Sequence, residues 1–479
     1  MSLYYRPDKG VLGDMIPFYD NGVFKPFYLR NYRGNRDAAH QDSWVMLSTT
    51  DHVHFTEHDT KIVGGTGSVI KVDGLYHMFF CTFQVNPERN YINHAISTDL
   101  DVWTEIPEDR FRSDDQIYAP VHWRDPFVFW VEEEQCWWMI FAAQKKGPTT
   151  RRGCVGLCKS DDLHHWRYCE PLYAPMNAQC AFECPDLFRM GDWYYLAFSS
   201  YADRFQTLYR KSRSLYGPWV TPEIDTFDTR AFYAAKTGTD GIHRYVYGWN
   251  PTREDNEHHF DPLGYDGKDC NTWDWGGNLI VHELWQDETG DLFVKPLDTV
   301  LEAVGKKTEL FALPLTGDWT MDGEKASVET PYGYAALLLN RLEGTDRLSF
   351  DVEVKEGTAA VGVGIHVDEE FSVGYYIHID FYRRRMEFKT GVRMTEKGGQ
   401  MFPYEVELER PLPTATGNRF HVDIIASDTI LEAYVDHRVV LGTRMFDIEG
   451  GCFGIYAEEG EASFTNIQVF RENDGKICE

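Results

Sequence analysis

The sequence predicts an all-β protein in which a five-bladed β-propeller is followed by a C-terminal β-sandwich. Strand-like runs bounded by Gly, Asp and Asn occur throughout the 479 residues, whereas stretches with helical periodicity are scarce. A hairpin signature also recurs five times within the first 300 residues. Because this length suits two domains, we expect a propeller over residues 1–300, a linker over 301–316 and a sandwich over 317–479.

Two signatures interleave along the first part of the chain. The hairpin signature joins a short apolar strand, a polar or glycine turn and an aromatic-rich strand, and it occurs at 18–29, 70–80, 127–141, 187–198 and 237–249. The second combines Ser, an acid and an aromatic residue at 48–57, 97–105 and 160–168, with a looser copy at 212–220. Spacings of about 50 to 60 residues are typical of four-stranded propeller blades. Unrelated hairpins in a sandwich are the alternative, which the shared period disfavours.

Three acidic residues occupy similar positions in this repeat. Asp14 lies eight residues before Gly22, Glu183 lies eight before Gly191, and Asp125 lies at the same distance before the next polar turn. Each therefore stands at the start of the first strand of a predicted blade. Because the first strand of a blade lines the central channel of a propeller, we expect the three carboxylates to meet at one end of that channel.

Converging carboxylates cannot all stay ionised at low cost, so at least one pKa rises. Such a set contains an ionised carboxylate beside a protonated acid, which is the combination that glycoside cleavage requires. A Ca²⁺ or Mg²⁺ site is one alternative, although the neighbouring residues are aromatic and hydrophobic rather than Asp- and Asn-rich. Asp14 and Asp125 as simple turn formers are another. We expect neither a metal nor a cofactor.

At these residues the sequence resembles glycoside hydrolase family 32, the invertase, levanase and inulinase family. The stretch "WRDPFVFW" at 123–130 is similar to its Arg-Asp-Pro motif, and "ECPDLF" at 183–188 is similar to its Glu-Cys motif. Weaker similarities to its fifth blade, to the segment that closes its propeller and to its β-sandwich occur at 232–249, 273–297 and 421–446. The resemblance covers nearly the whole chain and implies a propeller with a β-sandwich.

The resemblance implies a role for each acid. Glu183 would be the general acid/base, Asp125 would stabilise the transition state, and Arg124 would contact the sugar or hold the carboxylates. The nucleophile would be the aspartate of the first-blade motif Asn-Asp-Pro-Asn-Gly, where this chain reads "GDMIPFYDNG" at 13–22. Counting back from the aromatic strand favours Asp14, since Asp20 then falls in a hairpin turn.

Several positions depart from the family pattern. Gly13 replaces the asparagine before the nucleophile, and Phe182 replaces the tryptophan before Glu-Cys. The family's Trp-Gly-His-Ala stretch appears as "WVMLS" at 44–48. These positions belong to the sugar-binding shell of the family, so their loss leaves the chemistry intact but puts the fructose specificity in doubt. Related five-bladed families act on arabinofuranose and xylose, some with inversion.

Other residues are candidates for contact with a sugar. Trp44, Trp123 and Tyr233 lie near a predicted channel mouth, and aromatic faces stack on sugar rings, although most tryptophans pack blades together. Ser68, at the end of "GGTGS", is similar in place to a serine of the family's second blade. The same stretch lacks the lysine of a phosphate-binding loop.

Two adjacent histidine pairs, His164/His165 and His258/His259, are poor joint metal ligands, because neighbouring residues of a strand point to opposite faces. The polar loop 250–271 either overhangs the channel or is solvated surface.

Composition limits the partners. Asp and Glu total 76 against 47 Lys and Arg, for a net charge of −29, which disfavours nucleic acid and anionic membranes. The first residues lack a signal-peptide core, no run reaches the roughly 18 apolar residues of a membrane span, and the ten cysteines are scattered. We expect a cytoplasmic protein with reduced thiols. The C-terminal domain would brace the propeller, join protomers of a homo-oligomer, or bind carbohydrate.

The sequence thus predicts a retaining glycoside hydrolase that cleaves terminal β-fructofuranosidic or related furanosidic bonds in short oligosaccharides. In this hypothesis Asp14 forms a glycosyl-enzyme, Glu183 transfers protons and Asp125 stabilises the positive charge. A non-catalytic carbohydrate-binding propeller, or a hydrolase resembling arabinofuranosidases and xylosidases, is the alternative.

Overall fold

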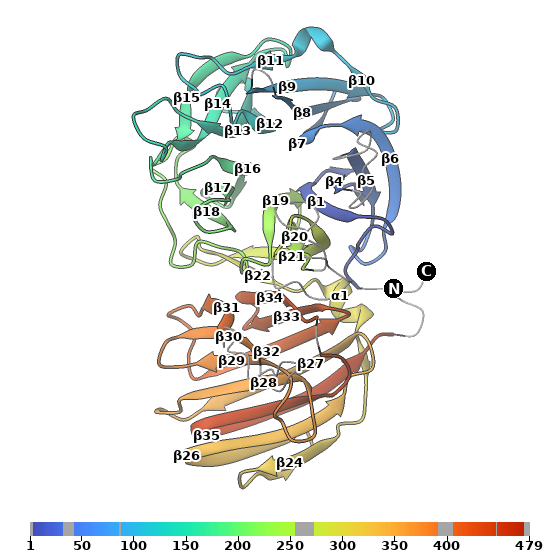
Figure 1. The fold of residues 1–479 in the computed structure, drawn as a ribbon, viewed down its shortest axis with the longest axis vertical. Helices are drawn as coiled ribbons and strands as arrows, with labels where there is room; N and C mark the ends of the chain where they lie inside the picture. The colour runs from blue at the N-terminus through green and yellow to red at the C-terminus, as the bar shows by residue number, and fades with distance from the viewer. Residues whose placement is uncertain are drawn as a thin grey trace, which may run out of the picture.

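The computed structural model describes residues 3–31, 43–85, 88–253, 273–390, 406–446 and 448–473. A ring of β-sheets forms one part of the molecule, and a large sheet that begins near residue 306 forms the other (Figure 1). The predicted all-β class, a propeller followed by a β-sandwich, is confirmed. The described part of the chain contains no helix with the length and apolarity that crossing a membrane requires.

The beginning and the end of the ring share one sheet. Its strands run in the order β19-β20-β21-β1-β4-β5-β6, with β22 paired to β21, and a single pairing of Leu12 with Gly277 joins its two halves. The strands are β1 (Val11–Ile16), β4 (Phe27–Asn31), β5 (Ser43–Ser48), β6 (Thr56–Val63), β19 (Tyr233–Thr239), β20 (Arg244–Pro251), β21 (Gly277–Gln286) and β22 (Leu292–Lys295). The short hairpin of β2 (Tyr19–Asp20) and β3 (Val23–Phe24) follows β1.

Three further sheets complete the ring. The first contains β7 (Gly65–Val72), β8 (Leu75–Val85), β9 (Glu88–Ser97), β10 (Thr104–Glu105) and β11 (Phe111–Arg112), with the 3₁₀ helix η2 (Pro107–Asp109) between the last two. The second contains β12 (Arg124–Val131), β13 (Cys136–Gln144), β14 (Gly153–Ser160) and β15 (Arg167–Tyr173). The third contains β16 (Phe182–Met190), β17 (Trp193–Ser200) and β18 (Gln206–Ser212).

The inner strands close a circle. β1 contacts β7, β7 contacts β12, β12 contacts β16, β16 contacts β19, and β19 contacts β1 again. Each of these strands has a register shift against its hairpin partner near its start, at Gly13/Ile16, Gly65/Gly67, Arg124/Phe127, Glu183/Asp186 and Tyr233/Lys236. Such bulges bend a strand and redirect its side chains, and they are common beside active sites.

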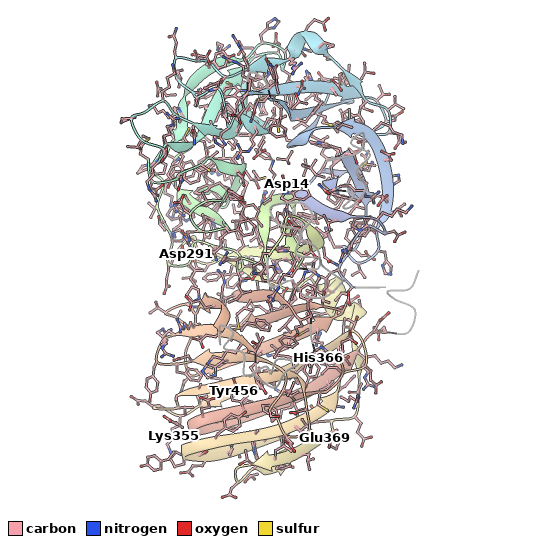
Figure 2. The ribbon with its side chains drawn as sticks, viewed as in Figure 1. Asp14, Asp291, Lys355, His366, Glu369 and Tyr456 are labelled. Carbon is pink, nitrogen blue, oxygen red and sulfur yellow. The ribbon has the colours of Figure 1, made fainter. Side chains whose placement is uncertain are left out.

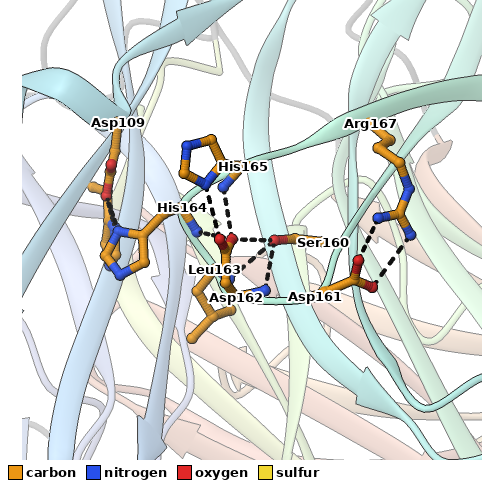
Figure 3. A network of polar contacts seen from close by, with 9 residues as sticks. Asp109, Ser160, Asp161, Asp162, Leu163, His164, His165 and Arg167 are labelled. Carbon is orange, nitrogen blue, oxygen red and sulfur yellow. Dashed lines mark hydrogen bonds and ion pairs between the residues drawn. The ribbon is translucent and has the colours of Figure 1, made fainter.

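The second sequence signature forms the same turn in three sheets. Ser160 Oγ donates to Asp162 Oδ1 and accepts the N–H of Leu163, while Asp162 Oδ1 accepts the N–H groups of His164 and His165 (Figure 3). Equivalent bonds link residues 97–102 and residues 49–54. The side chains therefore satisfy the backbone donors of a turn, which explains why the signature repeats with the blades.

The C-terminal sheet runs in the order β31-β30-β29-β28-β35-β27-β32-β33-β34, with β23 to β26 attached. One half of β35 pairs with β28 and the other with β27, so two arms enclose an apolar core that includes Leu348, Val363, Ile377 and Ile424. The strands are β26 (Lys325–Arg341), β27 (Asp346–Val354), β28 (Ala360–Val367), β29 (Tyr375–Asp380), β30 (Arg385–Thr390), β31 (Val406–Pro411), β32 (Arg419–Ser427), β33 (Ile430–Val435), β34 (Val439–Arg444) and β35 (Cys452–Arg471).

The segment expected as a linker is partly ordered into short elements. Helix α1 (Asp298–Ala303) precedes β23 (Lys306–Lys307), which pairs with β35. The strands β24 (Ala312–Thr316) and β25 (Thr320–Asp322) both pair with β26. The domain limits drawn from the sequence stay a prediction.

Buried hydrogen bonds join the ring to the C-terminal sheet. Asp228 Oδ1 accepts the N–H of Gly442 at 2.8 Å, and the guanidinium of Arg444 donates to the carbonyl oxygens of Asn250 and Pro251 at 3.0 and 2.7 Å. Because these groups are removed from water, breaking any one of the bonds would leave a buried polar atom without a partner. The two parts are therefore held in one orientation.

Candidate active site

Four inner strands carry the polar residues of the site at their bulges. In each bulge a first residue is followed by one with positive φ: 34° at Asp14, 58° at Asp125, 47° at Cys184 and 50° at Ala234. The first residues are Gly13, Arg124, Glu183 and Tyr233. Asp14 and Asp125 thus share a position, whereas Glu183 lies one residue earlier in its bulge, a difference that counting residues to the turn did not reveal.

The bulge of β12 directs the side chains of two neighbouring residues, Arg124 and Asp125, toward the same strand, β16. Arg124 donates from Nη2 to Glu183 Oε1 at 2.6 Å, while Asp125 Oδ2 accepts the N–H of Cys184 at 3.0 Å. In a regular strand these neighbours would point to opposite faces. The positive φ of Asp125 therefore brings the Arg124 guanidinium and a carboxylate together at β16.

Glu183 is held from two sides. Its Oε1 accepts a hydrogen bond from Arg124, and its Oε2 accepts one from the Tyr233 hydroxyl at 2.6 Å. A second guanidinium nitrogen of Arg124 lies 2.7 Å from Nδ1 of His122, and a third lies 3.8 Å from Asp125. Burial and the nearby guanidinium lower the pKa of His122 to about 4, so its neutral ring accepts the Arg124 proton.

Asp14 lies on the inner side of the ring (Figure 2) and within the field of the other two acids. Burial, Asp125 and Glu183 raise the pKa of Asp14 to about 8, against a hydrogen bond from Trp249 Nε1 at 3.3 Å. Burial also raises the pKa of Asp125, where Arg124 opposes the rise and Glu183 adds to it. The three carboxylates therefore interact, and the site keeps a proton through neutral pH.

Two cations, the buried Lys236 and the partly exposed Arg124, balance these acids. Lys236 on β19 reaches across to β7, where its Nζ donates to the carbonyl oxygen of Gly67 at 2.8 Å, and its charge lowers the pKa of both Asp14 and Asp125. Arg124 neutralises Glu183 on the other side. These side chains place two positive charges beside the three carboxylates.

Asp20, the other candidate for the first-blade aspartate, lies in a different environment. Its carboxylate pairs with Lys71 at 2.9 Å and accepts the hydroxyl proton of Tyr76 at 2.8 Å. Asp20 thus links β2 to the sheet of β7 and β8, whereas Asp14 interacts with Asp125 and Glu183. The structure favours Asp14 for the chemical role.

Three of the predicted sugar contacts are enclosed by protein. Trp44 and Trp123 are both 0% exposed, and Trp44 Nε1 donates to the carbonyl oxygen of Gly65 at 3.0 Å. Neither indole has a face open to a ligand, and this burial argues against the predicted stacking, because both rings pack between strands instead. Ser68 is buried as well, and its Oγ accepts the N–H of Val128 at 3.0 Å.

The structure adds residues that the sequence analysis did not single out. Trp249 bonds to Asp14, the half-buried ring of Trp275 lies against Gly13, and Phe205 stacks on Tyr233 with ring centroids 4.2 Å apart. Both tryptophans occur in stretches that resemble the family, which was the available signal. Lys236 lies in the same fifth-blade stretch as Trp249, whereas no motif marks His122.

The histidine pairs differ in what can be described. His164 Nδ1 faces Asp109 and His165 Nδ1 faces Asp162, so the two rings have separate partners (Figure 3). His258 and His259, with most of the loop 250–271, lie outside the described residues.

Comparison with known proteins gives one family. The model described as "Glycosyl hydrolases family 32 N-terminal domain" matches residues 5–296. The levanbiose-producing levanase of Bacillus subtilis (strain 168) is 24% identical, over 97% of this chain and 89% of that protein. The sucrose-6-phosphate hydrolase of Escherichia coli is 32% identical, over 27% of this chain and 29% of that protein.

Solved structures show the same fold. Fructan 1-exohydrolase IIa from Cichorium intybus superposes with a TM-score of 0.73 at 13% identity, and covers 98% of this chain and 97% of its own. Exo-inulinase from Aspergillus awamori superposes with a TM-score of 0.71 at 14% identity, over 98% of both chains.

Proposed function

Because the chain belongs to glycoside hydrolase family 32, we propose that it hydrolyses β-fructosides, with retention, through a fructosyl-enzyme intermediate. The observation that carries this proposal is the convergence of three carboxylates from three inner strands, where desolvation and the other two acids raise the pKa of Asp14 to about 8. Retaining glycosidases need one ionised carboxylate and one protonated carboxyl on either side of the scissile bond. A site of three acids and two cations meets this requirement without a metal ion.

The first step uses Asp14 as the nucleophile and Glu183 as the acid. The Asp14 carboxylate attacks the anomeric carbon while Glu183 gives its proton to the glycosidic oxygen, and the leaving sugar departs as an alcohol. The proton that the free site keeps must then be on Glu183.

The second step reverses these roles. Glu183 removes a proton from water, the resulting hydroxide attacks the anomeric carbon, and the bond to Asp14 breaks with its electrons returning to the carboxylate. Arg124 and Tyr233 orient Glu183 in both steps, because each donates to a different oxygen. Asp125, fixed by the Cys184 N–H, is placed to accept hydrogen bonds from sugar hydroxyls and to stabilise the positive charge.

The proposed substrates are short oligosaccharides with a terminal fructofuranosyl unit. The name levanbiose-producing levanase, which a relative spanning nearly the whole chain carries, supports β-fructosides as the class. The replacement of the first-blade asparagine by Gly13 sets this chain apart from the family motif, so the linkage and the leaving group are to be determined by assay. The cytoplasmic location and self-association through the C-terminal sheet stay predictions.

The test is hydrolysis of sucrose, inulin and levan oligosaccharides and nitrophenyl arabinofuranoside by wild type and by Glu183→Gln. We expect β-fructosides to be cleaved and Glu183→Gln to lose about 10²- to 10⁴-fold in kcat, the usual contribution of a general acid. Glu170→Gln, on the exposed side of β15, is the matched control and should retain full activity. With methanol present, retention gives methyl β-fructofuranoside.

Three results would contradict the proposal. One is binding of fructosides without turnover by wild type, which would indicate a sugar-binding propeller. Another is turnover of the arabinofuranoside alone, which would indicate a different furanosidase. A methyl α-fructofuranoside product would rule out retention.

A further inference from the structure

Two histidines of the C-terminal sheet point to one carboxylate oxygen. His421 Nε2 and His437 Nε2 each lie 2.9 Å from Asp423 Oδ2, and the three atoms lie within 4.8 Å of one another. Imidazole nitrogens and a carboxylate are the ligands that zinc and its neighbours in the first transition series accept. The cluster lies in the sheet, far along the chain from the three carboxylates of the active site.

The local fold brings these residues together in two ways. His421 and Asp423 lie two residues apart on β32, so their side chains leave the same face of the strand. His437 comes from the turn between β33 and β34, where its φ is 49° and that of its neighbour Asp436 is 53°. Glycine is the usual residue at such a φ, so the turn carries a histidine at a conformational cost.

A second carboxylate supports His421 from behind. Asp351 Oδ1 lies 2.9 Å from His421 Nδ1, and Asp351 is itself held by Asn466 Nδ2 at 2.7 Å. Histidines that bind metals commonly donate their other N–H to a carboxylate in this way. Without an ion, His421 must donate from both nitrogens to satisfy its two carboxylates. With an ion on Nε2, it keeps the single Nδ1 proton that faces Asp351.

We propose that His421, Asp423 and His437 form a binding site for a divalent transition-metal cation of the Zn²⁺ type. On binding, His421 releases its Nε2 proton to solvent, and His437 carries its proton on Nδ1. Ligand atoms around zinc are about 3.3 Å apart in a tetrahedron with bonds near 2.0 Å, so the 2.9 Å contacts need only a small expansion. The histidine side chains are 34% and 35% exposed, which leaves room for water as a fourth ligand.

The charges around Asp423 define the limits of the site. Its carboxylate is 3% exposed, and its other oxygen, Oδ1, lies 3.5 Å from Nε of Arg347. The Arg347 guanidinium therefore lies beside Oδ1, and Oδ2 contacts the two histidines. Asp351 and Asp423 together offset the charge of a divalent ion, so the site does not depend on an anionic ligand from solution.

The place of the cluster gives the ion a structural role. The carbonyl oxygen of His437 accepts a hydrogen bond from Trp285 Nε1 at 2.7 Å, and the Arg438 guanidinium lies 5.0 Å from the centroid of that indole. Trp285 belongs to β21, in the ring of sheets. An ion that fixes His437 to β32 would therefore hold the turn that docks on the ring.

A second histidine cluster provides an internal control. His94 Nδ1 and His164 Nδ1 lie 2.6 and 2.7 Å from Asp109 Oδ2. There, the other nitrogen of His94 faces His77 Nδ1 at 2.9 Å instead of a carboxylate. Neutral rings satisfy every one of these contacts, so we expect no requirement for an ion at this cluster.

The experiment is calorimetric titration of the untagged, chelator-treated full chain with ZnCl₂ near pH 7, with CaCl₂ as a hard-cation control. We expect saturable binding of Zn²⁺, no binding of Ca²⁺ at this cluster, and a rise in the unfolding temperature with Zn²⁺. His437→Asn, which tolerates the positive φ, should weaken Zn²⁺ binding strongly, and Asp351→Asn should weaken it about 10- to 100-fold. His164→Gln should leave it unchanged. Co²⁺ should give visible absorption bands of a tetrahedral site.

The proposal is overturned if wild type binds no Zn²⁺, or if His437→Asn binds as tightly as wild type. It also fails if His164→Gln abolishes the only Zn²⁺ binding observed. Circular dichroism checks that each variant folds. If His437→Asn does not fold, the Zn²⁺ affinity of Asp351→Asn is the test of the proposal. Fructoside hydrolysis is measured separately, so loss of the proposed catalytic function and loss of metal binding are distinguishable.

Discussion

Arg124 and Glu183 occupy the same position in the bulges of neighbouring inner strands, and Nη2 of the first lies 2.6 Å from Oε1 of the second. The bond therefore connects two blades through residues that repeat the same backbone geometry. It also fixes the carboxyl group that we propose as the general acid/base.

Arg124→Lys should lower kcat/KM by about 100-fold or more, equivalent to about 3 kcal/mol. Three different nitrogens of Arg124 reach Glu183, His122 and Asp125, and a single ammonium group cannot reproduce that planar arrangement. Steady-state kinetics on a β-fructoside measures the effect. Arg151→Lys, at an exposed pair with Asp203, is the control. Equal kinetics for both variants would show that Arg124 does not position Glu183.

Asp14→Asn should make the protein more stable than wild type at pH 8 but not at pH 4. The pKa of Asp14 is raised from 3.8 to about 8, so the folded state holds this proton more tightly than the unfolded state. The associated stability is complete below the unfolded pKa and is lost as pH rises through about 8. Asparagine does not titrate, so the gain at pH 8 is on the order of a few kcal/mol.

Urea unfolding of both proteins at several pH values measures this difference. A gain that is constant from pH 4 to pH 8 would contradict a raised pKa at Asp14. Asp14→Asn should also lose fructoside hydrolysis. A variant that is more stable at pH 8 but inactive would show that the Asp14 carboxylate lowers stability and is needed for catalysis.

Gly13→Asn should destabilise the protein by roughly 1–3 kcal/mol, the usual cost of overpacking. A Cβ atom at Gly13 would lie 2.3 Å from the Trp275 ring, so the indole occupies the space that the family's asparagine would need. Thermal unfolding measures the change. Adding Trp275→Ala should recover most of the stability, and a double variant no more stable than Gly13→Asn would refute this steric explanation.

Asp162→Ala should cost about 1–2 kcal/mol, since its carboxylate accepts hydrogen bonds from Ser160 and from two backbone N–H groups of the turn. The neighbouring Asp161→Ala is the control, because Asp161 pairs with the exposed Arg167 (Figure 3). Chemical denaturation measures both. Equal losses would mean that the turn is not held by its side chains.

The sequence predicted the features that depend on residues close together in the chain. The hairpin turns and the Ser-x-Asp turns depend on residues a few positions apart, so their repetition predicted the ring of sheets before any contact was known. The acids 14, 125 and 183 were found because each follows the same spacing to its turn. The sequence did not predict that Glu183 lies one residue earlier in its bulge than Asp14 and Asp125 do in theirs, because a bulge changes which of two neighbouring residues faces inward.

Contacts between distant segments were decided by the tertiary structure alone. The positions of Trp44 and Trp123 in the sequence predicted that their rings stack on a sugar, but the packing of adjacent strands encloses both rings. Lys236 lies in a stretch similar to the family's fifth blade, but its contact with Gly67 exists because β19 and β7 belong to the same closed circle.

The sequence by itself thus determined the class of fold, the repeat and the three acids, because periodicity and turn chemistry act between residues close in the chain. Only the tertiary structure decided which side chains share the site and which are buried, and it alone brought His437 to Asp423. Those relationships depend on how strands from separate parts of the chain close around one another, and no local pattern encodes that closure.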